Sequence, residues 1–253
     1  MDLHTAKQVN LFSLQTDNRA ERGAAMHLSF GVNLEVFGGV EVSGNIADHS
    51  GGGMYIYDSS ARLHHDVTLT GNEAKGDGAD GGGAIMLKFD SALELRDGVT
   101  IRGNSATNSG GGIGAEGSTI ESSNRMVLDI RGNVSISNNV AAGGGGGIEI
   151  SNANISISDH VAISNNQAGE SGGAIRLTDS NIDIRNQVVI QGNDCQDQGG
   201  AIFATFSTIR LASDVAVIEN SAQSDGGGIC ILVSVTPHPV FSSENMVCHY
   251  PFC

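Results

Sequence analysis

The apolar residues of this chain fall in short pairs, with one polar residue between the two members of each pair. In the stretch that begins at Ile175, the pairs are Ile175 with Leu177, Ile182 with Ile184, and Val188 with Ile190. The stretches that begin at Ile148 and Ile202 repeat this arrangement. A period of two predicts strands, and polar turns separate the pairs. We therefore expect three short strands in each stretch.

A second regularity is an asparagine in the phrase apolar-x-x-Asn-x-Ala, followed within a few residues by two glycines. Successive asparagines are 27, 27, 32, 35, 27, 27 and 27 residues apart. They are Asn18, Asn45, Asn72, Asn104, Asn139, Asn166, Asn193 and Asn220. A nearly fixed period in this range indicates stacked structural repeats. Eight copies of the repeat occupy residues 18–231.

The strands are too short to bury their apolar faces within one repeat. Each must lie against the matching strand of the next repeat, about 4.8 Å away. The sequence therefore predicts an all-β, right-handed parallel β-helix of about eight coils of ~27 residues, the hand following from that of parallel crossovers. We expect residues 1–17 to form a degenerate N-terminal coil or cap, residues 18–231 the repeats, and residues 232–253 a tail without repeats.

The repeated polar and small residues have structural interpretations. Asn45, Asn72, Asn104, Asn139, Asn166, Asn193 and Asn220 are expected to stack as a structural ladder. Each amide would bond to its neighbours along the rod, and a binding residue is rarely required at every coil. The alanine two residues later, replaced once by Cys195, predicts a tight inward slot, whereas Cys230 is expected to lie outward. Glycine pairs such as Gly172 and Gly173 predict positive φ or close backbone approach.

These motifs carry a family resemblance. The run Ile163-Ser-Asn-Asn166-Gln-Ala168, followed by Gly172-Gly173-Ala174-Ile175, resembles the repeats of the chlamydial polymorphic membrane proteins. That family pairs a Gly-Gly-Ala-Ile tetrapeptide with Phe-x-x-Asn, and here an aliphatic residue stands at the Phe position. The resemblance implies a surface-exposed β-helical passenger, used for adhesion and exported as an autotransporter. Residues 1–17 contain no apolar segment suited to a signal peptide, so we expect a fragment of a longer surface protein.

Charge and hydropathy narrow the expected partners. The chain has 13 basic and 28 acidic residues and a net charge of −15, which argues against nucleic acid as a partner. No apolar run reaches the length of a membrane helix, so we expect no direct membrane insertion. The expected partners are a glycan or a protein on a partner cell. Uncapped strand edges also predict end-to-end self-association.

The middle strands place a candidate ligand-binding face on one side of the rod. In alignment, one outward column contains His64, Arg96, Arg131 and Arg185. These cations could hold an acidic glycan or the carboxylates of a partner. The neighbouring column alternates in charge, beginning with Glu35, Arg62, Glu94 and Asp129. The alternative is therefore a solvated face whose arginines neutralise neighbouring acids.

Catalysis is the second class of function to weigh, because right-handed β-helices also carry pectin-degrading enzymes. Such hydrolases need two converging carboxylates. Only Asp58 and Asp90, with His64, His65 and Asp66 near in sequence, offer candidates. We expect no catalytic residues and no cofactor, with a degenerate polysaccharide-processing enzyme as the alternative. The acidic residues near the glycines lack the spacing of calcium-binding nonapeptides, so no metal site is expected.

Overall fold

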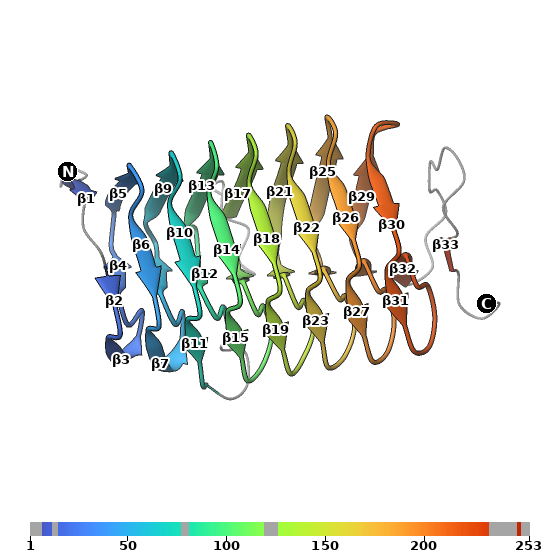
Figure 1. The fold of residues 1–253 in the computed structure, drawn as a ribbon, viewed down its shortest axis with the longest axis horizontal. Coiled ribbons are helices and arrows are strands. Elements are labelled where there is room, and N and C mark those ends of the chain that lie inside the picture. The colour runs from blue at the N-terminus through green and yellow to red at the C-terminus, as the bar shows by residue number, and fades with distance from the viewer. Residues whose placement is uncertain (1–6, 12–14, 77–80, 119–125, 233–246, 249–253) are drawn as a thin grey trace.

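The computed structural model of the chain is a solenoid of parallel strands (Figure 1). It describes residues 7–11, 15–76, 81–118, 126–232 and 247–248. All strands in these ranges lie in four parallel sheets, here called A to D, and these ranges contain no helix. Each coil runs through sheets A, B, C and D in that order and then enters sheet A of the next coil. The predicted fold class, a parallel β-helix of about eight coils, is confirmed.

Sheets A and B form the two long walls of the rod. Sheet A consists of β1 (Lys7–Leu11), β5 (Val32–Phe37), β9 (Ser60–His64), β13 (Ala92–Arg96), β17 (Met126–Arg131), β21 (Ala153–Ser158), β25 (Asn181–Arg185) and β29 (Thr208–Leu211). Sheet B consists of β2 (Gln15–Thr16), β6 (Glu41–Ser43), β10 (Thr68–Thr70), β14 (Thr100–Arg102), β18 (Ser135–Ser137), β22 (Ala162–Ser164), β26 (Val189–Gln191) and β30 (Ala216–Ile218).

Sheets C and D close each coil. Sheet C consists of β3 (Arg19–Arg22), β7 (Ile46–Ser50), β11 (Glu73–Ala74), β15 (Ser105–Ala106), β19 (Val140–Ala141), β23 (Gln167–Ala168), β27 (Asp194–Cys195) and β31 (Ser221–Ala222). Sheet D consists of β4 (Met26–Ser29), β8 (Met54–Tyr57), β12 (Ile85–Lys88), β16 (Ile113–Glu116), β20 (Ile148–Ser151), β24 (Ile175–Thr178), β28 (Ile202–Thr205), β32 (Ile229–Leu232) and β33 (Val247–Cys248).

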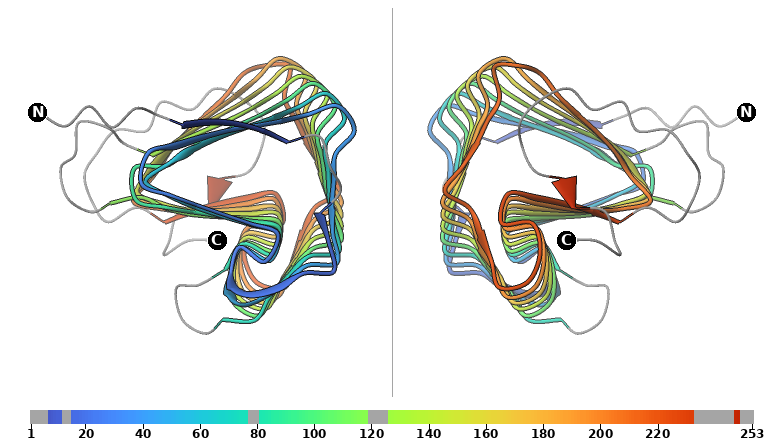
Figure 2. Two further views of the ribbon diagram at one scale, coloured as in Figure 1. Left: turned by 90° about the vertical axis from the view of Figure 1, so that its left-hand side faces the viewer. Right: turned by 90° about the vertical axis from the view of Figure 1, so that its right-hand side faces the viewer.

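The coils superpose into one outline with an indented side (Figure 2). The chain rises along sheet A at the back of Figure 1 and descends along sheet B at the front while advancing from N to C, which makes the solenoid right-handed. The prediction of three strands per coil missed sheet C. Most sheet C strands have only two residues, too few to show a period of two.

The predicted apolar pairs fill the interior of the rod. In one coil, both members of all three pairs are at most 2% exposed: Ile175, Leu177, Ile182, Ile184, Val188 and Ile190. The first pair lies in sheet D, the second in sheet A and the third at the start of sheet B. Stacked coils join these residues into a single core cluster. Cys195 fills the inward alanine slot and is buried, as predicted.

The repeated asparagines lie in the corner between sheets B and C and are hydrogen-bonded from coil to coil. Asn139 Nδ2 donates to Asn166 Oδ1 at 3.0 Å and to the Ile101 carbonyl at 3.1 Å. Its backbone N–H also donates to Asn166 Oδ1. Asn139 Oδ1 in turn accepts from the side chain and the backbone of Asn104. Every donor and acceptor of the amide therefore has a partner, although the side chain is fully buried.

The two glycines of a pair meet different steric demands. Gly172 has a φ of 73°, a left-handed conformation that suits glycine. A Cβ on Gly173 would lie 2.3 Å from the Gly200 carbonyl oxygen of the next coil. The first glycine thus turns the chain, and the second lets two coils approach closely.

Strands also occur outside the central repeats. β1 and β2 pair with β5 and β6 in register with sheets A and B, and β33 pairs with β32 in sheet D. Residues 1–6, 12–14, 233–246 and 249–253 lie outside the described ranges. The division of the chain into cap, repeats and tail stays a prediction.

Candidate functional site

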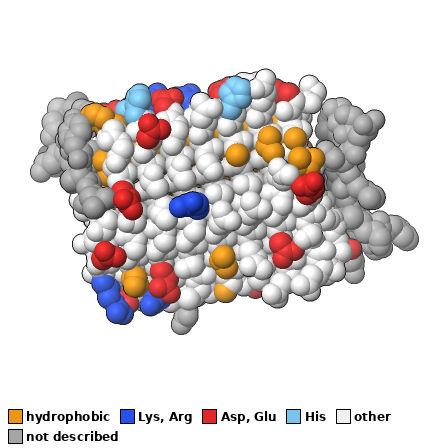
Figure 3. Space-filling model, in the orientation of Figure 1, with side chains coloured by type: hydrophobic (Ala, Val, Ile, Leu, Met, Phe, Trp, Pro, Cys, Tyr) orange, Lys and Arg blue, Asp and Glu red, His pale blue; other side chains and the backbone are white. Residues whose placement is uncertain are grey.

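The outer surface of sheet A concentrates the basic residues of this acidic chain. Of the lysine and arginine side chains that the structure describes, five lie there: Arg62, Arg96, Arg131, Arg185 and Arg210. The strands pair in the predicted register, so His64, Arg96 and Arg131 occupy one column in three successive coils. A shallow depression of about 580 Å³ lies over β5, β9, β13 and β17. On the opposite side, over sheets B and C, charged side chains of both signs are scattered among neutral ones (Figure 3).

Glu94 is the centre of an ion-pair network on this surface. Its carboxylate accepts hydrogen bonds from Arg62 Nε and Arg131 Nη2, both at 2.5 Å, and lies 3.4 Å from Arg96 Nη1. Partial burial opposes ionisation of Glu94, but the hydrogen bonds from Arg62 and Arg131 outweigh it and hold the pKa of this carboxyl below its usual range. One carboxylate therefore engages three arginines from three coils.

The other predicted face residues also have acidic partners. Arg185 lies two coils beyond Arg131, and Arg185 Nη1 is 2.5 Å from Asp183 Oδ2 on the same strand. His64 is only 7% exposed, and its Nε2 lies 3.0 Å from Glu35 Oε1. The structure thus brings His64, Arg96 and Arg131 together and leaves Arg185 apart. The proposed role of these four residues in ligand binding stays a prediction.

The candidate catalytic grouping falls at two separate corners. Asp58 and Asp90 lie between sheets D and A, just before β9 and β13, whereas His64, His65 and Asp66 lie at the opposite end of β9. Five residues of extended strand span about 16 Å. The aspartates and the histidines therefore do not form an acid and base pair around one bond.

The corner between sheets D and A carries an exposed aromatic ladder that the sequence patterns did not reveal. Phe30, Tyr57 and Phe89 come from three successive coils, with ring centroids 5.5 Å apart for Phe30 and Tyr57 and 4.6 Å apart for Tyr57 and Phe89. Phe30 is 70% exposed and Phe89 is 47% exposed. Both have a φ of 60°. Other coils place Asp58, Asn152 or Asp179 at this position, residue types that tolerate positive φ.

The comparisons with known proteins support the resemblance noted in the sequence. Residues 160–178 match the family model of the Chlamydia polymorphic membrane protein repeat. This segment contains Asn166 and Ala168 together with the glycine pair and Ile175. No curated protein and no solved structure matches the chain. The repeat and the β-helix fit a surface-displayed β-helical passenger.

A separate finding concerns membranes. None of the residues that the structure describes belongs to a helix long and apolar enough to cross a bilayer.

Proposed function

We propose that this chain is a non-enzymatic segment of a surface-displayed passenger and that it makes adhesive contacts through its aromatic ladder, Phe30, Tyr57 and Phe89. Three rings lie together on successive coils, with the half-buried ring of Tyr57 between the exposed rings of Phe30 and Phe89, beside an otherwise polar corner. The matched repeat, from a family of membrane proteins, supports placement at a cell surface.

The positive φ of the backbone at this corner is the observation on which the proposal rests. A bulky residue at positive φ is unfavourable by about 1–3 kcal/mol, and burial does not compensate at Phe30 or Phe89. Asparagine or aspartate fits the same corner without a large exposed ring, as in other coils. Phe206 shares this strain and exposure, but Phe30 and Phe89 also lie against a common ring, Tyr57, and we infer that this grouped pair contacts a ligand.

The surroundings favour a neutral glycan on a partner cell as the ligand. Aromatic rings offer flat apolar faces to the C–H groups of sugars. Asp58 and Asp90 are exposed at the same corner, where carboxylates can accept hydrogen bonds from sugar hydroxyls. Together with the net charge of −15, these acids disfavour a negatively charged ligand.

The double variant Phe30→Asn, Phe89→Asn tests the proposal. Binding to intact partner cells and to an array of neutral and acidic glycans should fall by about 5- to 150-fold. The reason is that two aromatic rings stacked on a ligand together contribute about 1–3 kcal/mol, and about 1.4 kcal/mol corresponds to a tenfold change in affinity. Thermal stability should rise, because asparagine tolerates the left-handed backbone better than phenylalanine does.

Two controls separate this ladder from other surfaces. Phe206→Asn changes a phenylalanine with the same exposed corner position, 62% exposed and with a φ of 51°, but far along the rod from the ladder. It should gain stability and keep full binding. The triple variant Arg96→Ser, Arg131→Ser, Arg185→Ser tests the arginine face. Adhesion that survives the double Phe variant but disappears in the Arg variant would refute the aromatic ladder and support the arginine face.

A further inference from the structure

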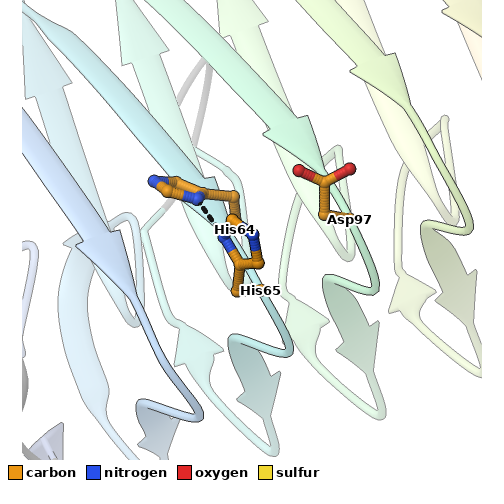
Figure 4. Close-up of side chains that lie close together, drawn as sticks. All are labelled: His64, His65 and Asp97. Carbon is orange, nitrogen blue, oxygen red and sulfur yellow. Dashed lines mark hydrogen bonds between the residues drawn. The ribbon is translucent and has the colours of Figure 1, made fainter.

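We propose that His64, His65 and Asp97 form a binding site for a divalent transition-metal ion, of which Zn²⁺ is the best fitted. One ligand atom from each residue can be chosen so that all three lie within 4.8 Å of one another. Figure 4 shows the two imidazole rings side by side, with the Asp97 carboxylate next to them on the neighbouring coil. This inference is independent of the adhesive role proposed above.

The local backbone explains why two successive histidines can share one ion. Consecutive residues of a strand point to opposite faces. However, β9 ends at His64, and His65 has a φ of 58°, so the chain turns and brings the second ring back to the first. The ring centroids are 4.6 Å apart, and His64 Nδ1 faces His65 Nδ1.

Parallel register supplies the third ligand. His64 pairs with Arg96 of β13, so His65 and Asp97 are successive members of the same corner column. Asp97 also has a positive φ, 55°, and its side chain is 49% exposed. The same position holds Gly38 in the preceding coil and Gly132 in the following one. Among the described coils, His65 and Asp97 are therefore the only successive members of this column that combine an imidazole with a carboxylate.

Glu35, on β5 of the preceding coil, acts as a positioning residue. Its Oε1 lies 3.0 Å from His64 Nε2, and the Phe37 ring stacks on the His64 ring with centroids 5.4 Å apart. A carboxylate that accepts the Nε2–H selects the tautomer in which the Nδ1 lone pair is directed at the ion, and it fixes the orientation of the ring. His64 is buried and therefore held in this orientation, whereas His65 and Asp97 form the exposed rim.

The donor set selects the class of metal. Two imidazole nitrogens suit Zn²⁺, Ni²⁺ or Cu²⁺, whereas Ca²⁺ and Mg²⁺ prefer oxygen ligands. Three protein ligands leave one position of a tetrahedral Zn²⁺ for water or for a group of a partner molecule. The carboxylates of Asp97 and Glu35 offset the positive charge of the ion.

Titration calorimetry of metal-free protein with Zn²⁺, and with Co²⁺ as a spectroscopic probe, tests the site. We expect one equivalent of Zn²⁺ to bind and Co²⁺ to give visible absorption bands. His65→Asn and Asp97→Asn should each weaken Zn²⁺ binding by about tenfold or more. Both side chains are exposed and asparagine tolerates positive φ, so these variants should keep the fold, as far-ultraviolet circular dichroism can verify.

His160→Asn is the matched control. His160 is also an exposed histidine at a corner between sheets A and B, with a φ of 65°, but Asp159 and not a second histidine precedes it. This variant should bind Zn²⁺ as the parent does. Glu35→Ala should weaken binding about tenfold, and Glu35→Gln, which keeps an acceptor oxygen, should restore most of it. Parent-like affinity in both His65→Asn and Asp97→Asn would overturn the proposal, as would a parent protein that binds no Zn²⁺.

Discussion

At the scale of single residues, the asparagine amide suits its corner because it offers two donors and an acceptor oxygen with two lone pairs. From Asn45 to Asn193, Nδ2 of each ladder residue bonds forward to the next amide and backward to a main-chain carbonyl, and Oδ1 accepts twice, as Asn139 shows. Aspartate has no donor and would stack like charges one coil apart, and leucine would leave the backbone groups unpaired. The recurrence of asparagine is therefore explained by hydrogen bonding within the rod.

Replacement of one rung should be costly. In Asn139→Ala, the backbone N–H and Nδ2 of Asn104 lose their acceptor, and the Ile101 carbonyl loses a donor. Because unpaired buried groups cost about 1–3 kcal/mol each, we expect a loss of roughly 3–5 kcal/mol in the free energy of unfolding, measured with urea. Asn181→Ala removes an exposed side-chain bond to Asn154 and should change stability by less than about 0.5 kcal/mol. Equal effects of the two changes would contradict this account.

At the scale of elements, the outward column of sheet D is less exposed than a two-sided strand pattern suggests. Tyr55, Met86, Phe203 and Cys230 are all buried, although they point away from the main core. The glycine loops pack against this column, so that a Cβ on Gly226 would lie 2.9 Å from Cys230 Cβ. Cys230 thus lies on the outward face of its strand, as predicted, and is nevertheless buried beneath the glycine loop.

A carboxylate in this column makes stability depend on pH. Burial raises the pKa of Glu149 on β20 to about 7, although Arg176 on the next coil opposes the shift. Because the folded state holds this proton more tightly than the unfolded state, the stabilisation is complete below pH ~4.5 and is lost as pH rises through about 7.

Glu149→Gln should remove this dependence. Since the side chain is still 18% exposed, we expect a gain of about 1–2 kcal/mol in the free energy of unfolding at pH 8 and little change at pH 4, from urea titrations at both pH values. Glu170→Gln, at a 61% exposed carboxylate beside the same arginine, serves as the control. If the Glu149→Gln variant is no more stable than the parent at pH 8, the raised pKa of Glu149 is disproved.

The extent to which the sequence predicts this structure differs between strands and corners. Period-two pairs locate the strands of sheets A, B and D, and the repeat length determines their register, so the column of His64, Arg96 and Arg131 follows from counting. Corners behave differently, since a residue at positive φ redirects its side chain. The contact of His64 with His65 and the exposure of Phe30 both depend on such turns, which no hydrophobic period encodes.

The sequence predicts only part of the pairing among charged side chains. Counting places Glu94 beside Arg62 and Arg131, but it does not show that one carboxylate engages both of them and Arg96. Side-chain length and rotamer decide this arrangement. Arg62 pairs with Glu94 and Glu35, at 2.5 and 3.9 Å, as the alternating charges of this column suggest. Asp183 instead pairs with Arg185 on its own strand.

At the scale of the whole molecule, the rod is modular because each coil contacts mainly its two neighbours. Ile148 pairs with Ile175, and residues 27 apart are equivalent over this part of the chain. The free energy of unfolding of such a solenoid is roughly a sum of coil and interface contributions.

Removal of residues 149–175 should therefore leave a shorter rod. The deletion joins Ile148 to Arg176, which occupies the position of Glu149, so every inward side chain keeps its face. We expect the β-sheet circular dichroism spectrum and cooperative urea unfolding to persist. Removal of residues 149–176, one residue more, shifts the register within a strand and turns inward residues outward, so it should destabilise the rod by several kcal/mol. Comparable stability of the two deletions would show that register is not fixed within these strands.

The asparagine ladder also makes the two ends of the rod chemically different. Each amide donates twice toward the C-terminal side, through its backbone N–H and one Nδ2–H, and accepts twice from the N-terminal side. A rod extended at its C-terminal end therefore has a last rung whose two forward donors lack the next amide; in Asn220, Nδ2 bonds instead to the Ile218 carbonyl of its own coil. A rod's first rung instead presents an acceptor oxygen that has no donor from a preceding coil. The two ends are therefore complementary, so rods that associate through their ladders match head to tail and not head to head.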